Sequence, residues 1–303
     1  MWTNYPKYLT PGDRVAVVSP SGALDPELID EACETLRKWR LVPVVGEYAK
    51  GKYVRFAGTD QQRLQDLQWA MDDPTISAIL CGRGGYGTIH LTDFISTNEL
   101  KINPKWIIGF SDISALHAMC HRAGIASIHS SMAKQLALFG TDNHCNKALR
   151  NILTGQLPSY TTPSHPFNRM GSVTGEIVGG NLAVLSGLIG TEYDLLLPDK
   201  ILFIEDIAEP IYKVERILYN LRLSGVLQRL KGLIVGQFTD YREPDANGDT
   251  MYGMIRRMIE PYDYPVCFDF PIGHIDGNLP VIEGATASLN ITPHEAKLEF
   301  LHI

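Results

Sequence analysis

The stretch Trp106-Ile-Ile-Gly-Phe-Ser-Asp-Ile-Ser-Ala-Leu116 predicts a strand that turns directly into a helix. Apolar residues of strand character end at Gly109, and Ser111 follows two residues later. At such a turn a side chain projects beyond the sheet, beside backbone N–H groups that have no partner within the helix. Ser111 is therefore a candidate nucleophile. The alternative is that Ser111 or Asp112 only caps the helix, because Gly-x-Ser-Asp lacks the second glycine of a nucleophile elbow.

Strands and helices alternate through the first half of the chain. We expect helices to begin near Asp25 and Thr59, between apolar strands at 14–18, 41–45, 76–81, 106–108 and 126–129. Strands buried on both faces and separated by helices are typical of a doubly wound parallel sheet. Sites in such sheets lie at the carboxyl ends of the strands, where this chain has Ser19-Pro-Ser21, Gly82–Gly87, Ser111 and His129.

The composition changes between Thr154 and Thr174, where turn-forming residues replace aliphatic ones. We therefore expect a first domain over 1–155, a linker over 156–172 and a second domain over 173–303. The second half mixes strands and helices in a less regular order. It predicts a domain of mixed α and β character.

Composition and charge exclude several function classes. A formal net charge of -7 without a basic block argues against nucleic acid or an anionic membrane as the main partner. The chain has no apolar run long enough to span a bilayer, and its first residues lack a secretory pattern, so we expect a cytoplasmic protein. The five cysteines are scattered, and no histidine spacing is typical of a metal site. We expect neither a metal nor a cofactor.

A glycine-rich turn, Gly82-Arg-Gly-Gly-Tyr-Gly87, follows the predicted strand at 76–81. Its spacing is not that of a nucleotide-binding fingerprint. We expect it to neighbour Ser111 and to let the backbone pass close to a reacting atom, with N–H groups that could hold an oxyanion. The alternative is an ordinary tight turn. Arg83 either supplies a charge for a substrate carboxylate or braces the turn.

A carboxylate and a histidine complete the candidates. Glu205 lies on an apolar strand, where it could orient an imidazole; the alternative is an acidic residue at a helix start. His274 lies in a glycine-flanked loop, Phe270-Pro-Ile-Gly-His274-Ile-Asp-Gly-Asn278. His129, at a strand end, is its competitor.

Taken together, these motifs resemble the LD-carboxypeptidases, serine peptidases that include the murein tetrapeptide carboxypeptidases and the microcin-immunity peptidases. The resemblance runs from Gly12 to the final strands and rests on five ordered motifs: Gly82-Arg-Gly-Gly-Tyr-Gly, Gly109-Phe-Ser-Asp, Gly179-Gly-Asn-Leu, Phe203-Ile-Glu-Asp and Gly273-His. It implies a Rossmann-like (class I glutamine amidotransferase-like) parallel sheet domain that carries the nucleophile. A smaller mixed α/β domain with a small β structure would carry the glutamate and the histidine.

The resemblance also implies roles for residues. The nucleophile falls on Ser111, the histidine on His274 and the glutamate on Glu205, with backbone N–H groups of Asp112 and Gly85 as oxyanion donors. The implied reaction is hydrolysis of the L,D amide bond that releases terminal D-alanine from murein tetrapeptide in peptidoglycan recycling.

Two other functions stay open at this point. One is a microcin-immunity-like amidase that cleaves a peptidyl- or aminoacyl-nucleotide conjugate, and the other is a non-catalytic binding module. The family also suggests a homodimer. The chain departs from many members at His129-Ser-Ser-Met132, where those members have His-Gly-Pro-Met.

Overall fold

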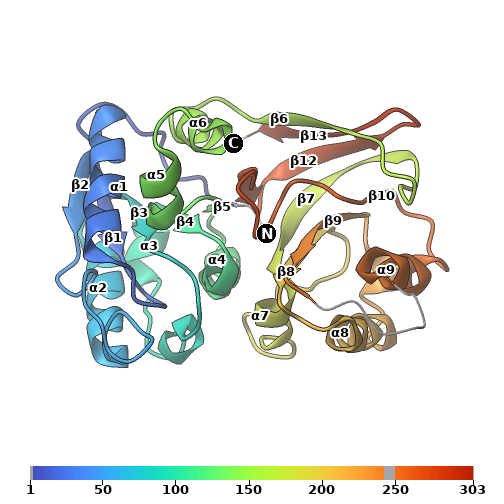
Figure 1. Ribbon diagram of the computed structural model, residues 1–303, viewed down its shortest axis with the longest axis horizontal. Coiled ribbons are helices and arrows are strands. Elements are labelled where there is room, and N and C mark those ends of the chain that lie inside the picture. Colours follow the sequence, from blue (N-terminus) through green and yellow to red (C-terminus); the bar gives the residue numbers. More distant parts are fainter. Residues whose placement is uncertain (1–2, 242–249, 303) are drawn as a thin grey trace. The chain divides into compact units, whose positions relative to one another are not determined.

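The computed structural model describes residues 3–241 and 250–302, which form two compact units (Figure 1). The first unit comprises the described residues up to 156 together with 279–284, and the second comprises the described residues of 157–278 together with 285–302. Each unit combines one sheet with helices, so the chain has a mixed α/β fold. In the part of the chain that the structure describes, no helix is both long and apolar enough to cross a bilayer.

The first unit contains a six-stranded sheet in the order β11-β5-β4-β3-β1-β2. Its strands are β1 (Arg14–Val18), β2 (Val42–Val45), β3 (Ile76–Cys81), β4 (Trp106–Gly109), β5 (Ser127–His129) and β11 (Val281–Glu283). The pairs from β2 to β5 are parallel, which agrees with the alternating pattern of the sequence. The exception is β11, which the sequence did not predict and which pairs antiparallel with β5, Val281 opposite His129.

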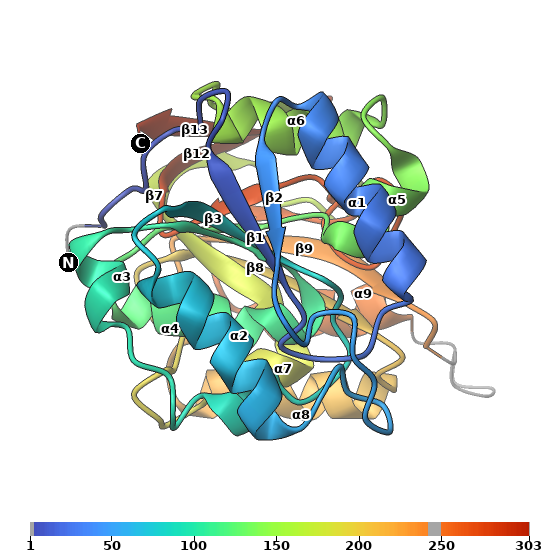
Figure 2. The same ribbon diagram turned by 90° about the vertical axis from the view of Figure 1, so that its left-hand side faces the viewer.

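Helices cover both faces of this sheet. They are α1 (Pro26–Lys38), α2 (Asp60–Asp72), α3 (Asn98–Ile102), α4 (Ser114–Arg122), α5 (Ala133–Phe139) and α6 (His144–Leu153), with short 3-10 helices η1 (Thr88–Leu91) and η2 (Ser111–Ile113). Helix α1 packs against α5, and Figure 2 shows β1 and β2 between α1 and α2. Because α1, α2 and α4 follow β1, β2 and β4 in the chain, each of these helices begins beyond the carboxyl end of a parallel strand.

Local side chains fix where two of these helices begin. Asp25 caps α1 by accepting a hydrogen bond from the Glu27 N–H, and Pro26 occupies the first helical position. Thr59 and Gln62 form a reciprocal capping box at the start of α2. Both starts were expected from the sequence.

A buried lysine fixes the other end of α2. The Lys105 ammonium donates hydrogen bonds to the carbonyl oxygens of Ala70, Met71 and Asp73, at 2.9, 2.8 and 2.6 Å. These carbonyls lie where an α-helix has no internal donors, so the cation satisfies them and benefits from the helix dipole. Lys105 immediately precedes β4, so the contact also positions the strand that leads to Ser111.

The second unit contains a seven-stranded sheet in the order β10-β9-β8-β7-β12-β13-β6. The strands are β6 (Ser159–Pro163), β7 (Gly171–Asn181), β8 (Ile201–Ile207), β9 (Gly232–Thr239), β10 (Val266–Cys267), β12 (Thr286–Ile291) and β13 (Glu295–His302). The pairs from β7 to β10 are parallel, and those from β7 through β12 and β13 to β6 are antiparallel. The helices are α7 (Leu182–Ser186), α8 (Ile211–Leu223), α9 (Met251–Ile259) and η3 (Leu227–Arg229).

The segment expected to be a linker over 156–172 is partly structured. It contains β6, which pairs with β13 at the edge of the second sheet, and β7 begins at its end. Alternate residues of β6 are exposed, which is typical of an edge strand with one face in water. Turn-forming and polar residues are common in such strands, so composition alone did not separate β6 from a loop.

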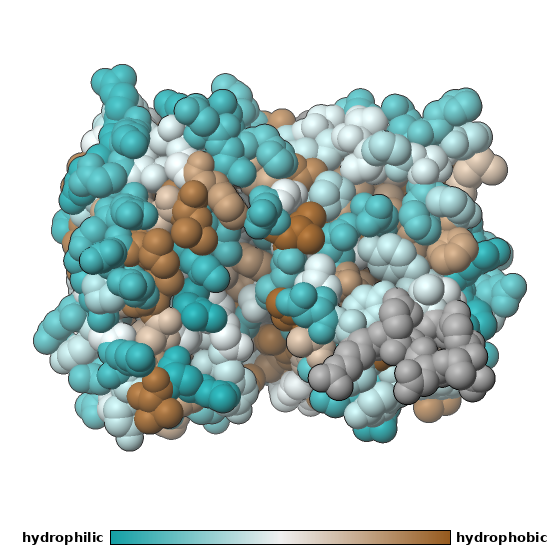
Figure 3. Space-filling view, in the orientation of Figure 1, coloured by the Kyte–Doolittle hydropathy of each residue, from teal (hydrophilic) through white to brown (hydrophobic). Residues whose placement is uncertain are grey.

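The buried core consists of aliphatic and aromatic side chains on the strands and the inner helix faces. Every described residue of β4 is buried, and so are all five cysteines. In Figure 3, the visible surface is largely hydrophilic, and hydrophobic residues form small patches. The polar residues that are buried are therefore the exceptions that require a structural or functional reason.

Candidate active site

The turn after β4 holds Ser111 in an unusual backbone conformation. Ser111 has φ of 65°, in the left-handed region that non-glycine residues rarely adopt. It also begins η2, and α4 follows from Ser114. A left-handed residue costs about 1–3 kcal/mol and persists only where its surroundings hold it in place, which is common at functional sites. The turn thus differs from an ordinary helix cap, for which no such conformation is needed.

The glycine turn lies directly against Ser111, as the sequence predicted. A Cβ on Gly84 would lie 2.7 Å from the Ser111 Cβ and 2.8 Å from its Oγ, so no side chain fits at that position. Gly85 has φ of 131°, and no acceptor for its N–H occurs within residues 3–241 and 250–302. The turn therefore brings an available N–H donor close to the serine.

The Asp112 side chain ties the strand ends of the first unit together. Its buried Oδ2 accepts hydrogen bonds from the Ser21 hydroxyl at 2.7 Å and from the Thr88 N–H at 2.9 Å. Ser21 follows β1, Thr88 ends the glycine turn after β3, and Asp112 follows β4. The Asp112 carboxylate thereby connects three neighbouring turns. The backbone N–H of Asp112 is the one directly after Ser111 in the chain.

A second buried polar group, His117, supports β4 from within α4. Its Nε2 lies 2.9 Å from the Gly109 carbonyl oxygen, and its Nδ1 lies 2.8 Å from the Ser127 hydroxyl. Because a carbonyl only accepts, the Nε2 carries the proton and the Nδ1 accepts from Ser127. Burial lowers the pKa of His117 to about 4, so the ring stays neutral near pH 7. No pattern in the sequence indicates this role beyond the position of His117 on a buried helix.

In the second unit, Glu205 and His274 form a close pair. The His274 Nδ1 lies 2.7 Å from the Glu205 Oε2, although 69 residues separate them in the chain. Glu205 is fully buried on β8, and the His274 side chain is 14% exposed. Burial lowers the pKa of His274, but the hydrogen bond and charge of Glu205 outweigh it, so the pKa is raised above its ordinary value. The contact fixes the tautomer in which Nδ1 carries a proton and Nε2 is available as a base.

Two residues near His274 shape its loop. Gly273 has φ of 128°, and a Cβ there would lie 2.9 Å from the Glu205 Cβ and 3.0 Å from its Oε2. The Gly273 N–H donates to the Asn278 Oδ1 at 2.9 Å, which closes the loop. Only glycine combines this backbone conformation with such a close approach to the carboxylate. Asn278 was not singled out from the sequence.

The carboxylate next to Glu205 has a structural role. Asp206 accepts hydrogen bonds from the Ala183 N–H and the Asn181 side chain, both at 2.8 Å, at the start of α7. Burial, with the neighbouring charge of Glu205, raises the pKa of Asp206 to about 7. These contacts give Asp206 a role at the start of α7, separate from the contact of Glu205 with His274.

The predicted residues therefore fall into two groups. Ser111, Asp112, Gly85 and Arg83 lie in the first unit, and Glu205 and His274 lie in the second. The Arg83 Nε donates to the Gly84 carbonyl at 3.1 Å, within the turn, and the residue also lines a pocket. Its role towards a substrate carboxylate stays a prediction. His129, the histidine that competes with His274 as the candidate base, is fully buried within β5. No cluster of His, Cys, Asp or Glu that could hold a metal occurs among the described residues.

Comparisons with known proteins identify the family of the chain. Residues 15–130 match the model of the LD-carboxypeptidase N-terminal domain, and residues 174–289 match that of the LD-carboxypeptidase C-terminal domain. The chain is 32% identical to the murein tetrapeptide carboxypeptidase of Pseudomonas aeruginosa, over 91% of this chain and 92% of that protein.

Solved structures of other proteins have a similar fold. The crystal structure of muramoyltetrapeptide carboxypeptidase from Oxalobacter formigenes is similar, with a TM-score of 0.87 and 26% identity over 95% of this chain and 98% of that one. An MccF-like protein from Bacillus anthracis has a TM-score of 0.85 at 21% identity, over 99% of this chain and 100% of that one. At that identity the likeness concerns the fold alone.

Proposed function

Since this chain belongs to the LD-carboxypeptidase family and is a peptidase, we propose that it is a serine carboxypeptidase that releases terminal D-alanine from murein tetrapeptide. The observation that carries the proposal is the 2.7 Å contact between His274 and buried Glu205. It supplies an oriented base of raised pKa, as serine hydrolases require. Ser111, held in a strained turn beside Gly84, is the nucleophile of this proposal.

In the proposed mechanism, the His274 Nε2 takes the proton of the Ser111 hydroxyl while the Ser111 oxygen attacks the carbonyl on the L-centre of diaminopimelate. The tetrahedral intermediate collapses, the C–N bond breaks, and His274 gives the proton to the amine of the leaving D-alanine. Water then attacks the acyl-enzyme, again with His274 as base, and the tripeptide leaves. Glu205 stabilises the imidazolium that forms in each half of the reaction.

The oxyanion of the intermediate needs preorganised donors. We assign this role to the backbone N–H groups of Asp112 and Gly85, which belong to neighbouring turns of the first unit. The available Gly85 N–H and the fixed position of Asp112 support the assignment. Such donors act on charge that develops in the transition state, and one of them is worth about 10²–10³ in turnover in a comparable hydrolase.

Finer features of the protein follow from the same proposal. The strand order of the first sheet, with a change of direction beside β1, supports its description as a Rossmann-like (class I glutamine amidotransferase-like) domain. A cytoplasmic location would give access to murein peptides during peptidoglycan recycling. The homodimer that the family suggests stays a prediction, and sedimentation of the purified protein tests it.

The experiment that tests the proposal is release of D-alanine from purified murein tetrapeptide. The wild-type protein should release it, and Ser111→Ala should lower the rate about 10⁴-fold or more. A phosphonate that reacts with active serines should label the wild type at Ser111 and leave the variant unlabelled. Near-normal release by Ser111→Ala would overturn the mechanism. Preference for an aminoacyl-nucleotide in a parallel assay would favour the amidase activity instead.

A further inference from the structure

A cavity in the first unit opens beside the glycine turn. It has a volume of about 850 Å³ and is lined by three segments: the loop from Gly22 to Pro26, the loop from Lys50 to Arg55, and the turn from Arg83 to Tyr86. These segments follow β1, β2 and β3. The pocket thus lies where neighbouring chain connections leave a parallel sheet in opposite directions, which is the usual position of a ligand site in such folds.

The charge of this pocket is strongly one-sided. Its lining contains Lys50, Lys52, Arg55 and Arg83 against one acidic residue, Asp25. Lys50 is paired with Asp30 outside the lining, at 2.5 Å. In the part of the chain covered by 3–241 and 250–302, no carboxylate pairs with Lys52, Arg55 or Arg83. The surplus is notable in a chain whose net charge is -7.

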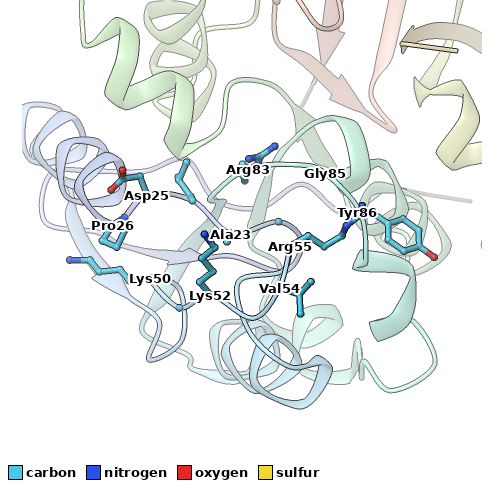
Figure 4. A pocket seen from close by; sticks show the side chains of 13 residues that line it. Ala23, Asp25, Pro26, Lys50, Lys52, Val54, Arg55, Arg83, Gly85 and Tyr86 are labelled. Carbon is cyan, nitrogen blue, oxygen red and sulfur yellow. The ribbon is translucent and has the colours of Figure 1, made fainter.

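The cations are directed around one space. In Figure 4, Lys52 extends towards Ala23, Arg55 extends towards Tyr86, and Arg83 lies above them in this view. Gly85 lines the pocket with its available N–H. A ligand with more than one negative group would meet a separate cation for each group, beside the donor assigned to the oxyanion.

We propose that this pocket binds the acidic acyl portion of the peptide stem, through Lys52, Arg55 and Arg83. The inference rests on the proposed function. A murein tetrapeptide carries free carboxylates on D-glutamate and on the second centre of diaminopimelate, in addition to the terminal carboxylate of D-alanine. The acyl portion therefore has two carboxylates for this surplus of cations, whereas the leaving D-alanine has one.

Size supports the same assignment. Pockets of about 300–1,000 Å³ are typical for ligands of drug size, and this pocket lies within that range. A single alanine is much smaller and would leave most of the cations facing water. Asp25 adds a site for the free ammonium of diaminopimelate, next to the carboxylate of the same centre. The pocket thus matches the acidic tripeptide portion of the stem in both charge and volume.

The test measures binding apart from catalysis. Titration calorimetry with the Ser111→Ala protein would measure the affinity for the tripeptide product, which lacks D-alanine, and for a tripeptide whose D-glutamate α-carboxylate is amidated. The double variant K52Q/R55Q should weaken tripeptide binding about tenfold, because each accessible ion pair is worth a few-fold in affinity. K101Q, at the end of α3 and outside the pocket, is the matched control and should leave affinity unchanged.

The amidated ligand separates charge recognition from general disruption of the loop. It should bind more weakly than the tripeptide to the parent protein, and K52Q/R55Q should reduce its affinity by a smaller factor. Equal tripeptide affinity in K52Q/R55Q and its parent would overturn the proposal, and so would equal losses for both ligands. Release of D-alanine by the wild type is scored separately, so failure of the proposed function would not be mistaken for failure of the pocket.

Discussion

The turn of Ser111 and the pair formed by Glu205 and His274 are built in opposite ways. Ser111 is held by segments next to β4: the glycine turn lies against it, and Asp112 beside it binds Ser21 and Thr88. The tautomer of His274 is defined by the Glu205 carboxylate, which comes from β8, 69 residues away in the chain. The first arrangement is distributed over several contacts, whereas the second is concentrated on the Glu205 carboxylate, which defines the tautomer of His274.

This difference predicts how each region responds to substitution. A distributed arrangement should tolerate the loss of a single hydrogen bond, because the remaining contacts keep the turn in place. The pair should lose its function with the Glu205 carboxylate, because that carboxylate defines the tautomer of the imidazole. The predictions below test this contrast, beginning with the largest expected effect.

Glu205→Gln should lower the rate of D-alanine release about 10³–10⁴-fold, because an amide neither fixes the tautomer nor stabilises an imidazolium. It should also change the pH profile. In the wild type, kcat/KM rises with pH as His274 loses its proton, and the raised pKa of His274 places that rise above the ordinary histidine value. Without the carboxylate the rise should move to lower pH.

Protein stability provides an independent check on the same pair. A raised histidine pKa means that the folded protein binds the proton more tightly than the unfolded chain. The pair therefore contributes most stability below the ordinary pKa of histidine, and this contribution is lost as pH rises through the raised value. Thermal melts at several pH values should show this loss in the wild type and not in Glu205→Gln. An unchanged pH profile and an unchanged melt would mean that Glu205 has no electrostatic effect on His274.

Gly84→Ala should reduce activity about 10–10²-fold, because its Cβ would lie within 3 Å of both Ser111 side-chain atoms and displace the nucleophile. The effect should appear mainly in kcat. Gly187→Ala is a suitable control: the new Cβ would contact only the Val184 carbonyl, at 3.3 Å, and Gly187 ends α7 in the second unit. Equal activity of the two variants would mean that Ser111 does not depend on the close approach of Gly84.

The sequence predicted most of the first unit because its elements are set by local patterns. The strands β1, β3 and β4 are continuous apolar runs, and α2 begins at a capping box that the sequence shows directly. The strands β6 and β11 escaped prediction because distant pairing stabilises them. Three-residue β11 acquires its conformation from β5, more than 150 positions earlier in the chain. Nothing within so short a segment distinguishes a strand from a turn.

The candidate site divides in the same way. The strand-to-helix turn and the glycines beside Ser111 were predicted from adjacent residues. Glu205 and His274 were connected only through the order of the family motifs, because spacing in the chain carries no information on a contact over 69 residues. His117 was missed for a further reason: a histidine on a buried helix gives no sign of which carbonyl it reaches.

His117→Phe should lower the free energy of unfolding by about 2–4 kcal/mol, because it leaves the Gly109 carbonyl and the Ser127 hydroxyl buried without this partner. The low pKa of His117 adds a pH signature. Between pH 6.5 and about 4, His117 is protonated in the unfolded chain and neutral in the folded protein. The free energy of unfolding therefore decreases as pH falls through this range. Denaturant unfolding at several pH values should show that the free energy of unfolding depends less steeply on pH in His117→Phe than in the wild type. The exposed His144, at the start of α6, is the control residue. The same substitution there should leave the pH dependence of the free energy of unfolding unchanged.

Ser21→Ala should give the smallest effect, since the Asp112 carboxylate keeps its hydrogen bond from the Thr88 N–H. We expect a loss of about 1 kcal/mol in stability and at most a few-fold change in kcat. Because the Ser21 hydroxyl binds Asp112 and not the carboxylate that raises the pKa of His274, the rise of kcat/KM with pH should stay where it is in the wild type. The pH dependence of kcat/KM in Ser21→Ala and Glu205→Gln, measured together, therefore compares the two regions directly. If Ser21→Ala reduced activity as strongly as Glu205→Gln, the turn of Ser111 would depend on a single contact, and the contrast between a distributed and a concentrated arrangement would be wrong.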